Sequence, residues 1–111
     1  MTARSEDLAW AAGFFEGEGT FYVRRERGKP NATVTLTQVD REPLDRFCEI
    51  VGIGKVYGPY GPYSGNRKPY FQWNAHRRGD ARTLLALLGG RLSQRRRLQA
   101  WDALIEEHLA A

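Results

Sequence analysis

The chain has 111 residues and a formal net charge of +4, which fits one domain and favours a polyanionic partner such as nucleic acid. Its one cysteine, Cys48, excludes an internal disulfide, and no apolar run approaches the length of a membrane-spanning helix. The N-terminus lacks the pattern of a signal peptide. We therefore expect a single domain over residues 1–111 that has no membrane partner and acts in the cytoplasm, or in an organellar or phage-encoded equivalent.

Eight segments with helix or strand periodicity follow one another along the chain. We expect helices over about residues 6–16, 41–51, 81–88 and 93–109, and strands over about residues 20–27, 32–39, 55–58 and 70–76. Ser5 and Asp40 are the expected N-caps of the first two helices. The last helix is expected to turn four apolar side chains inward, those of Leu98, Trp101, Leu104 and Ile105. The order is αββαββα with a split terminal helix, which predicts an α+β fold with a four-stranded, curved antiparallel sheet and helices on one face.

The most unusual segment is residues 8–21, LAWAAGFFEGEGTF. Ala9, Gly13 and Gly17 recur every four residues, so they share one helix face that carries almost no side chain. Glycine inside a helix costs up to about 1 kcal/mol, a loss that makes sense where another backbone comes very close. Glu16 and Glu18 lie at the electronegative end of this helix, and a hard divalent cation, Mg²⁺ by default, fits such a cluster of oxygens. The alternative interpretation is a core helix with a glycine C-cap and two solvated acids.

Polar and aromatic side chains alternate with apolar ones along the predicted strands. One face of the sheet is therefore expected to be open and poor in acid. It carries Tyr22, Arg24, Thr33, Thr35, Thr37, Tyr57, Tyr70, Gln72 and Asn74. Arginine, glutamine and asparagine are the bidentate readers of guanine and adenine in a DNA major groove, so we expect DNA contact here and at Arg67 and Lys68. The alternative is an ordinary solvated face, with an arginine-rich surface that reflects genomic bias.

Residues 11–19, AAGFFEGEG, resemble the LAGLIDADG motif of the homing endonuclease family. The match consists of a small residue and glycine, two bulky apolar residues, then acid, small residue, acid and glycine, although Ala11 departs from the pattern and glutamates replace both aspartates. The resemblance implies the same αββαββα fold for the whole chain. It also implies that Glu16 is mainly structural and that Glu18, with Gly17, holds the metal.

The resemblance further implies catalytic roles for a glutamine after the second strand and for a basic residue near the last helix. These roles fall on Gln38 and on Arg96, which is chosen because Gln99 follows it by three residues. Arg95 and Arg97 are close rivals for the second role. In the alternative interpretation, Gln38 is a strand-end hydrogen bonder and residues 95–97 are a solvated helix start.

The sequence holds a single copy of the motif, and one glutamate cannot hold a catalytic metal site alone. We therefore expect a homodimer in which two small-residue helix faces pack across a two-fold axis. The expected interface residues are Ala9, Ala12, Gly13, Glu16 and Gly17. The expected function is a site-specific double-strand DNA endonuclease that cuts a near-palindromic site with Mg²⁺, for which Mn²⁺ can substitute, and without an organic cofactor.

Two other functions fit the same residues. One is a DNA- or RNA-binding module on this fold without nuclease activity, such as a regulator or a splicing cofactor. The other is a small α+β protein-interaction domain, for which duplex DNA binding at low ionic strength is absent.

Overall fold

The computed structural model describes residues 4–61, 65 and 68–110. Its elements are α1 (Ser5–Glu18), β1 (Gly19–Glu26), β2 (Lys29–Gln38), α2 (Arg41–Val51), β3 (Lys55–Tyr60), β4 (Tyr70–Ala75), α3 (Asp80–Leu88), the short 3-10 helix η1 (Gly89–Arg91) and α4 (Gln94–Leu109). This order confirms the predicted αββαββα arrangement with a split terminal helix. Among the described residues, no helix combines the length and apolar character that crossing a membrane requires.

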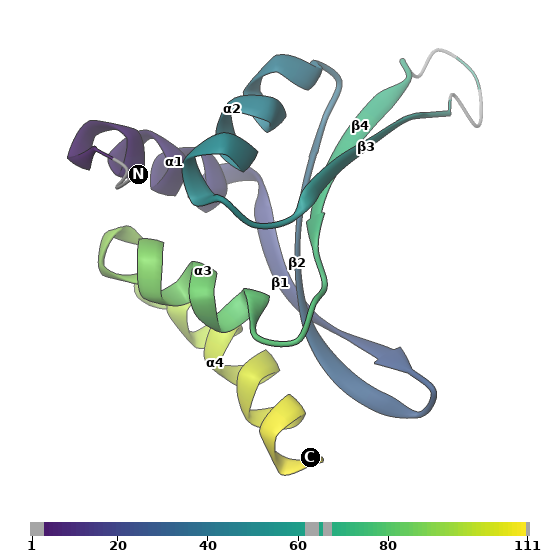
Figure 1. Ribbon diagram of the computed structural model, residues 1–111, viewed down its shortest axis with the longest axis vertical. Helices are drawn as coiled ribbons and strands as arrows, with labels where there is room; N and C mark the ends of the chain where they lie inside the picture. Colours follow the sequence, from purple (N-terminus) through teal and green to yellow (C-terminus); the bar gives the residue numbers. More distant parts are fainter. Residues whose placement is uncertain (1–3, 62–64, 66–67, 111) are drawn as a thin grey trace.

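The four strands form one antiparallel sheet in the order β1-β2-β4-β3. All of the helices lie on one side of this sheet, and the β1–β2 and β3–β4 hairpins extend away from them in different directions (Figure 1). The predicted α+β fold is therefore confirmed. One face of the sheet packs against the helices, and the other is left open.

Aromatic side chains connect the first two helices to the sheet. Phe15 of α1 stacks on Phe47 of α2 with ring centroids 6.1 Å apart, and Phe47 meets the Trp73 ring of β4 edge-on at 4.8 Å. All three side chains are fully buried. The Trp73 indole N–H also donates to the Ile53 carbonyl at 3.0 Å. These contacts fix the direction of α1, whose C-terminal end carries both predicted acids.

The helix and strand ends follow the local sequence closely. The Asp40 side chain caps α2 by accepting from the Glu42 amide, as predicted. The N-cap of α1 is Arg4 rather than the predicted Ser5, which is the first residue of the helix. The third strand runs on to Tyr60, beyond the predicted end at residue 58.

The orientation predicted for the last helix is wrong. Leu98, Trp101 and Ile105 of α4 are 54%, 53% and 51% exposed, and of the four residues predicted to face inward only Leu104 is buried. The inward face instead carries Arg96, Ala100, Ala103, Leu104 and Glu107. The physical reason is that α4 packs along β1, an edge strand with unpaired backbone groups, so its inner face is small and polar.

Candidate active site and nucleic-acid interface

Glu18 is the last residue of α1, and Gly19 begins β1 directly after it. A Cβ on Gly19 would lie 2.3 Å from the Phe15 ring, so only glycine allows the strand to start this close to the buried ring. Glu18 is exposed, and its carboxylate makes no hydrogen bond or ion pair with another described residue. The local sequence therefore places one free carboxylate at the junction between helix and sheet.

The small-residue face of α1 is bare within the chain. Ala9, Gly13 and Gly17 are exposed, and a Cβ added to either glycine would meet no described atom within 4 Å. The close backbone approach that the glycine spacing predicts therefore has no counterpart among the described residues. The face is free for a second molecule.

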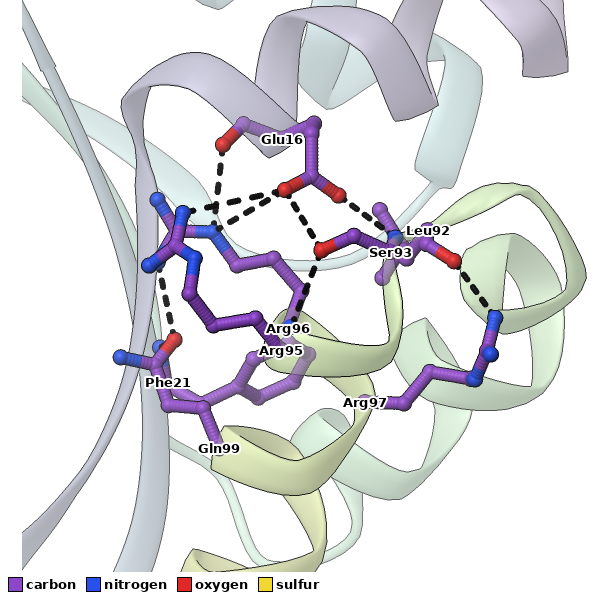
Figure 2. A network of polar contacts seen from close by, with 8 residues as sticks. All are labelled: Glu16, Phe21, Leu92, Ser93, Arg95, Arg96, Arg97 and Gln99. Atoms are coloured by element: carbon purple, nitrogen blue, oxygen red, sulfur yellow. Dashed lines mark hydrogen bonds and ion pairs between the residues drawn. The ribbon is translucent and has the colours of Figure 1, made fainter.

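Two residues predicted for the dimer interface make contacts inside their own chain. Ala12 is 1% exposed and belongs to the core, because it lies on the same side of α1 as the buried Phe15. The Glu16 carboxylate faces α4 of its own chain: its Oε1 accepts from the Ser93 amide at 2.7 Å and its Oε2 from the Ser93 hydroxyl at 2.8 Å (Figure 2). The surface part of the predicted interface is therefore Ala9, Gly13 and Gly17.

Glu16 joins the end of α1 to the start of α4. Ser93 is the N-cap of α4, and its hydroxyl accepts from the Arg96 amide at 3.2 Å. The guanidinium groups of Arg95 and Arg96 lie 3.8 and 3.9 Å from the Glu16 carboxylate. The Ser93 amide, helped by the Ser93 hydroxyl and both arginines, holds the pKa of Glu16 below its ordinary value against the opposing effect of burial.

Arg96, predicted to be catalytic, is buried at 7% exposure. Its Nε donates to the Glu16 backbone carbonyl at 3.2 Å, and its Nη1 donates to the Gln99 side-chain oxygen at 3.0 Å (Figure 2). Burial is the main cause that lowers the pKa of Arg96. The side chain that was chosen from the spacing to Gln99 is therefore engaged inside its own chain.

The two rival arginines differ in what their side chains contact. Arg97 donates through Nη1 to the carbonyls of Leu92 and Gly89, close to η1. The Arg95 side chain is 71% exposed, and its one described ion pair, with Glu16, is long at 3.8 Å. Arg95 is thus the member of the three with a guanidinium largely in solvent.

Gln38, the other residue predicted to be catalytic, is half-buried at the end of β2, opposite Phe71 of β4.

Most of the residues predicted for DNA contact lie at least partly at the surface. The exposed or half-buried ones are Tyr22, Arg24, Thr35, Thr37, Tyr57, Lys68, Tyr70, Gln72 and Asn74. Thr33 is an exception at 0% exposure: it lies on a central strand opposite Tyr22, and its hydroxyl donates to the Asn31 carbonyl at 3.1 Å. The prediction of Thr33 as a surface contact is therefore wrong, and Arg67 lies outside the described residues.

His76 is a polar residue outside the predicted site residues. It follows β4 directly and is half-buried, and its Nδ1 has no described hydrogen-bond partner, as is also true of Asn74 Oδ1. Both residues line a cavity of about 280 Å³ together with Lys55, Tyr57 and Arg77. The alternation of residues 70–76 puts His76 on the same side of the strand as Asn74, but it carries no signal that either side chain has an atom without a described partner.

The oxygen atoms at the end of α1 suit a hard metal cation as ligands, but one chain supplies few of them. Glu18 offers carboxylate oxygens, and the Gly17 carbonyl belongs to the last helical turn, where carbonyls lack an intrahelical partner. Within the described part of the chain, no three His, Cys, Asp or Glu side chains gather in a group that could hold a metal ion. One chain therefore supplies a fragment of an oxygen-ligand site.

No protein-family model matches this sequence, and a search of curated proteins also finds no match. Solved structures do match in fold. One is the homing endonuclease I-CvuI, solved in complex with an I-CreI target in the presence of Mg, with the DNA not cleaved. It superposes with a TM-score of 0.68 and 20% sequence identity, and the match covers 92% of this chain and 68% of I-CvuI. The LAGLIDADG meganuclease I-AabMI, bound to uncleaved DNA, superposes with a TM-score of 0.71 and 17% sequence identity. The match covers 92% of this chain and 36% of I-AabMI.

The group I intron-encoded homing endonuclease I-CeuI, complexed with DNA, also gives a TM-score of 0.71, at 12% identity over 98% of this chain and 57% of its own. These likenesses are of structure rather than sequence. The chain has the LAGLIDADG homing endonuclease fold, and the motif of residues 11–19 forms the end of α1 and the first residue of β1, as the resemblance implied.

Proposed function

We propose that this chain is a divalent-metal-dependent DNA endonuclease that acts as a homodimer on a near-palindromic duplex site. The observation that carries the proposal is the end of α1, where an exposed carboxylate without a described partner, Glu18, adjoins the bare face of Ala9, Gly13 and Gly17. Packing two such faces together brings two Glu18 carboxylates side by side, which completes a donor set that one chain leaves short.

Glu18 and the Gly17 carbonyl are the groups that would hold Mg²⁺, or Mn²⁺ in its place. The metal supplies an activated water and stabilises charge on the phosphate and on the leaving oxygen. No organic cofactor enters this proposal.

The protein side chains bind and orient the duplex around this centre. The open sheet face offers tyrosine, threonine, glutamine and asparagine side chains at the surface, and Glu26 of β1 is ion-paired with Arg24 at 3.5 Å. Arg95 is the guanidinium that reaches the phosphate backbone, since Arg96 and Arg97 are engaged inside the chain. Gln38 orients water from the end of β2, a role assigned by the resemblance.

A selection of cleaved sites from random duplexes, run with Mg²⁺, tests the activity. Glu18→Gln should abolish cleavage and leave duplex binding in place, because the amide keeps the shape of the side chain but loses the anionic ligand. Glu49→Gln is the matched control, since Glu49 is an exposed acid on α2 without a described partner. Cleavage by the Glu18→Gln protein would refute the metal-ligand role, and duplex binding without cleavage by the wild type would favour the non-cleaving nucleic-acid-binding module.

A further inference from the structure

The segment that carries Glu18 is attached to α4 at both of its ends. Two residues before Glu18, the Glu16 backbone carbonyl accepts from Arg96 Nε at 3.2 Å. Three residues after it, the Phe21 backbone amide donates to Gln99 Oε1 at 3.1 Å. These two bonds bracket the turn from α1 into β1, and neither of them involves Glu18 itself.

One oxygen atom joins the two attachments. Gln99 Oε1 also accepts from Arg96 Nη1 at 3.0 Å, so a continuous path runs from the Glu16 carbonyl through Arg96 and Gln99 to the Phe21 amide (Figure 2). Because both neighbours of this atom are donors, the side-chain atom that faces them is the oxygen rather than the nitrogen of the amide. A single acceptor with two lone pairs therefore holds both ends of the turn in register.

Burial makes this path rigid. Phe21 is 2% and Arg96 is 7% exposed, and Gln99 is half-buried, so water competes poorly for these bonds. The Glu16 carboxylate 3.9 Å from Arg96 Nε adds charge pairing on the same guanidinium. By contrast, the Glu18 side chain is exposed and has no described partner that could orient it.

We propose that Arg96 and Gln99 are positioning residues, which hold the Glu16–Phe21 turn so that Glu18 and the Gly17 carbonyl present their oxygens to the metal in a fixed geometry. This inference rests on the proposed function. Groups that orient a metal ligand change metal affinity by about 10- to 100-fold when removed, although they never touch the ion. Arg96 therefore acts through the backbone of its own chain instead of on the phosphate.

The duplex for the test is first selected from random sequences by its binding to the wild-type protein in EDTA. Mn²⁺ binding to the protein–duplex complex is then measured by electron paramagnetic resonance, which detects the free Mn²⁺. Gln99→Leu removes the shared acceptor and should weaken Mn²⁺ binding about 10-fold. Gln99→Glu restores an acceptor for both donors and should bring the Mn²⁺ affinity back to within about 3-fold of wild type. Gln94→Leu is the matched control, because Gln94 is an exposed glutamine in the first turn of the same helix.

Duplex affinity in EDTA should stay within about 2-fold of wild type in all three variants, since the open sheet face is unchanged. If Gln99→Leu folds poorly, Gln99→Asn provides the milder test: its shorter side chain reaches one donor at most, and Mn²⁺ binding should again weaken.

Three results overturn the inference. If Gln99→Leu and Gln94→Leu bind Mn²⁺ equally, Arg96 and Gln99 do not position the metal ligands, and the proposed function stands. If Gln99→Glu fails to restore Mn²⁺ affinity while its melting temperature is that of wild type, the shared acceptor is not what matters. If the wild-type complex binds no Mn²⁺, the metal role of Glu18 fails, and the inference fails with it.

Discussion

The carboxylate of Glu107, 6% exposed on α4, accepts a 2.7 Å hydrogen bond from the backbone amide of Ala32 on β2. This amide lies beyond the last paired residue of β4, where β2 no longer has a neighbour on that side. A buried acid on a helix thus replaces the missing strand. Gln99 does the same for the Phe21 amide of β1, so two α4 side chains accept hydrogen bonds from strand amides.

Replacing Glu107 by alanine should destabilise the fold by about 1–3 kcal/mol, because the Ala32 amide is left buried without an acceptor. The adjacent Glu106 offers a matched control. Its ion pair with Arg25 is short, at 2.8 Å, but both side chains are about half-exposed, so Glu106→Ala should cost less than about 1 kcal/mol. Urea denaturation of both variants measures the difference, and equal costs would contradict the assigned role of Glu107.

The fold could be predicted from the sequence because its strongest signals are local. The motif at residues 11–19, the cap at Asp40 and the alternation in residues 70–76 each specify an element without knowledge of the rest. Orientation is a different matter: the spacing of Leu98, Trp101 and Ile105 marks one face of a helix, but it does not say which face meets the sheet. The inward face is the one whose Gln99 and Glu107 side chains supply acceptors for the backbone amides of Phe21 on β1 and Ala32 on β2.

The same limit applies to the site residues. Glu18 and the glycine face could be found from the sequence because position in the motif places them at a helix end and on one stripe. Arg96 and its two neighbours could not be told apart, because their roles depend on which guanidinium of α4 meets the Glu16 carbonyl of α1, a helix far away in the sequence. Strand alternation predicts Thr33 at the surface, yet its side chain is fully buried and its hydroxyl donates to the Asn31 carbonyl of its own strand.

The loss of folding stability at low pH should depend on the Glu16 carboxylate. Hydrogen bonding from Ser93 keeps the pKa of Glu16 below the ordinary value of about 4.5, so the folded state favours the charged form. The resulting stabilisation is complete above that value and is lost as the pH falls through the lower, folded-state pKa. We expect Glu16→Gln to be less stable than wild type at pH 7, with the gap closing as the pH falls below about 4.5.

Urea denaturation at neutral pH, near the ordinary glutamate pKa and well below it measures the gap for Glu16. Glu49→Gln is again the control, because it removes an exposed carboxylate without a described partner and should leave the stability nearly unchanged at every pH. A gap for Glu16→Gln that is the same at all three pH values speaks against the hydrogen-bonded carboxylate as its cause.

Filling the bare face of α1 should have opposite effects on the monomer and the dimer. Gly13→Leu adds a side chain where a Cβ meets no described atom, so the monomer should gain up to about 1 kcal/mol of helix stability. The same side chain prevents two helix backbones from coming close, so the dimer should dissociate in sedimentation velocity at a matched concentration. Ala86→Leu adds comparable bulk on the exposed side of α3, in a groove that α3 forms with α4, and should leave the sedimentation coefficient unchanged.

Gln72 and Lys68 should affect DNA binding in different ways. Gln72 is half-buried on β4, a central strand on which it pairs with Thr37 of β2 and Tyr57 of β3, so its backbone is fixed and its amide can present a donor and an acceptor to a base edge. Lys68 is exposed outside the strand and can supply charge only. Gln72→Ala should therefore cost about 1–3 kcal/mol on the selected site and relax its sequence at one position, with the salt dependence unchanged.

Lys68→Ala should weaken binding to every duplex alike and lower the slope of log affinity against log salt by about 1, since one phosphate contact and its released counterion are lost. Binding to the selected duplex and to a scrambled one, each over a salt series, separates the two effects. If Gln72→Ala weakens binding to both duplexes equally, Gln72 does not read a base.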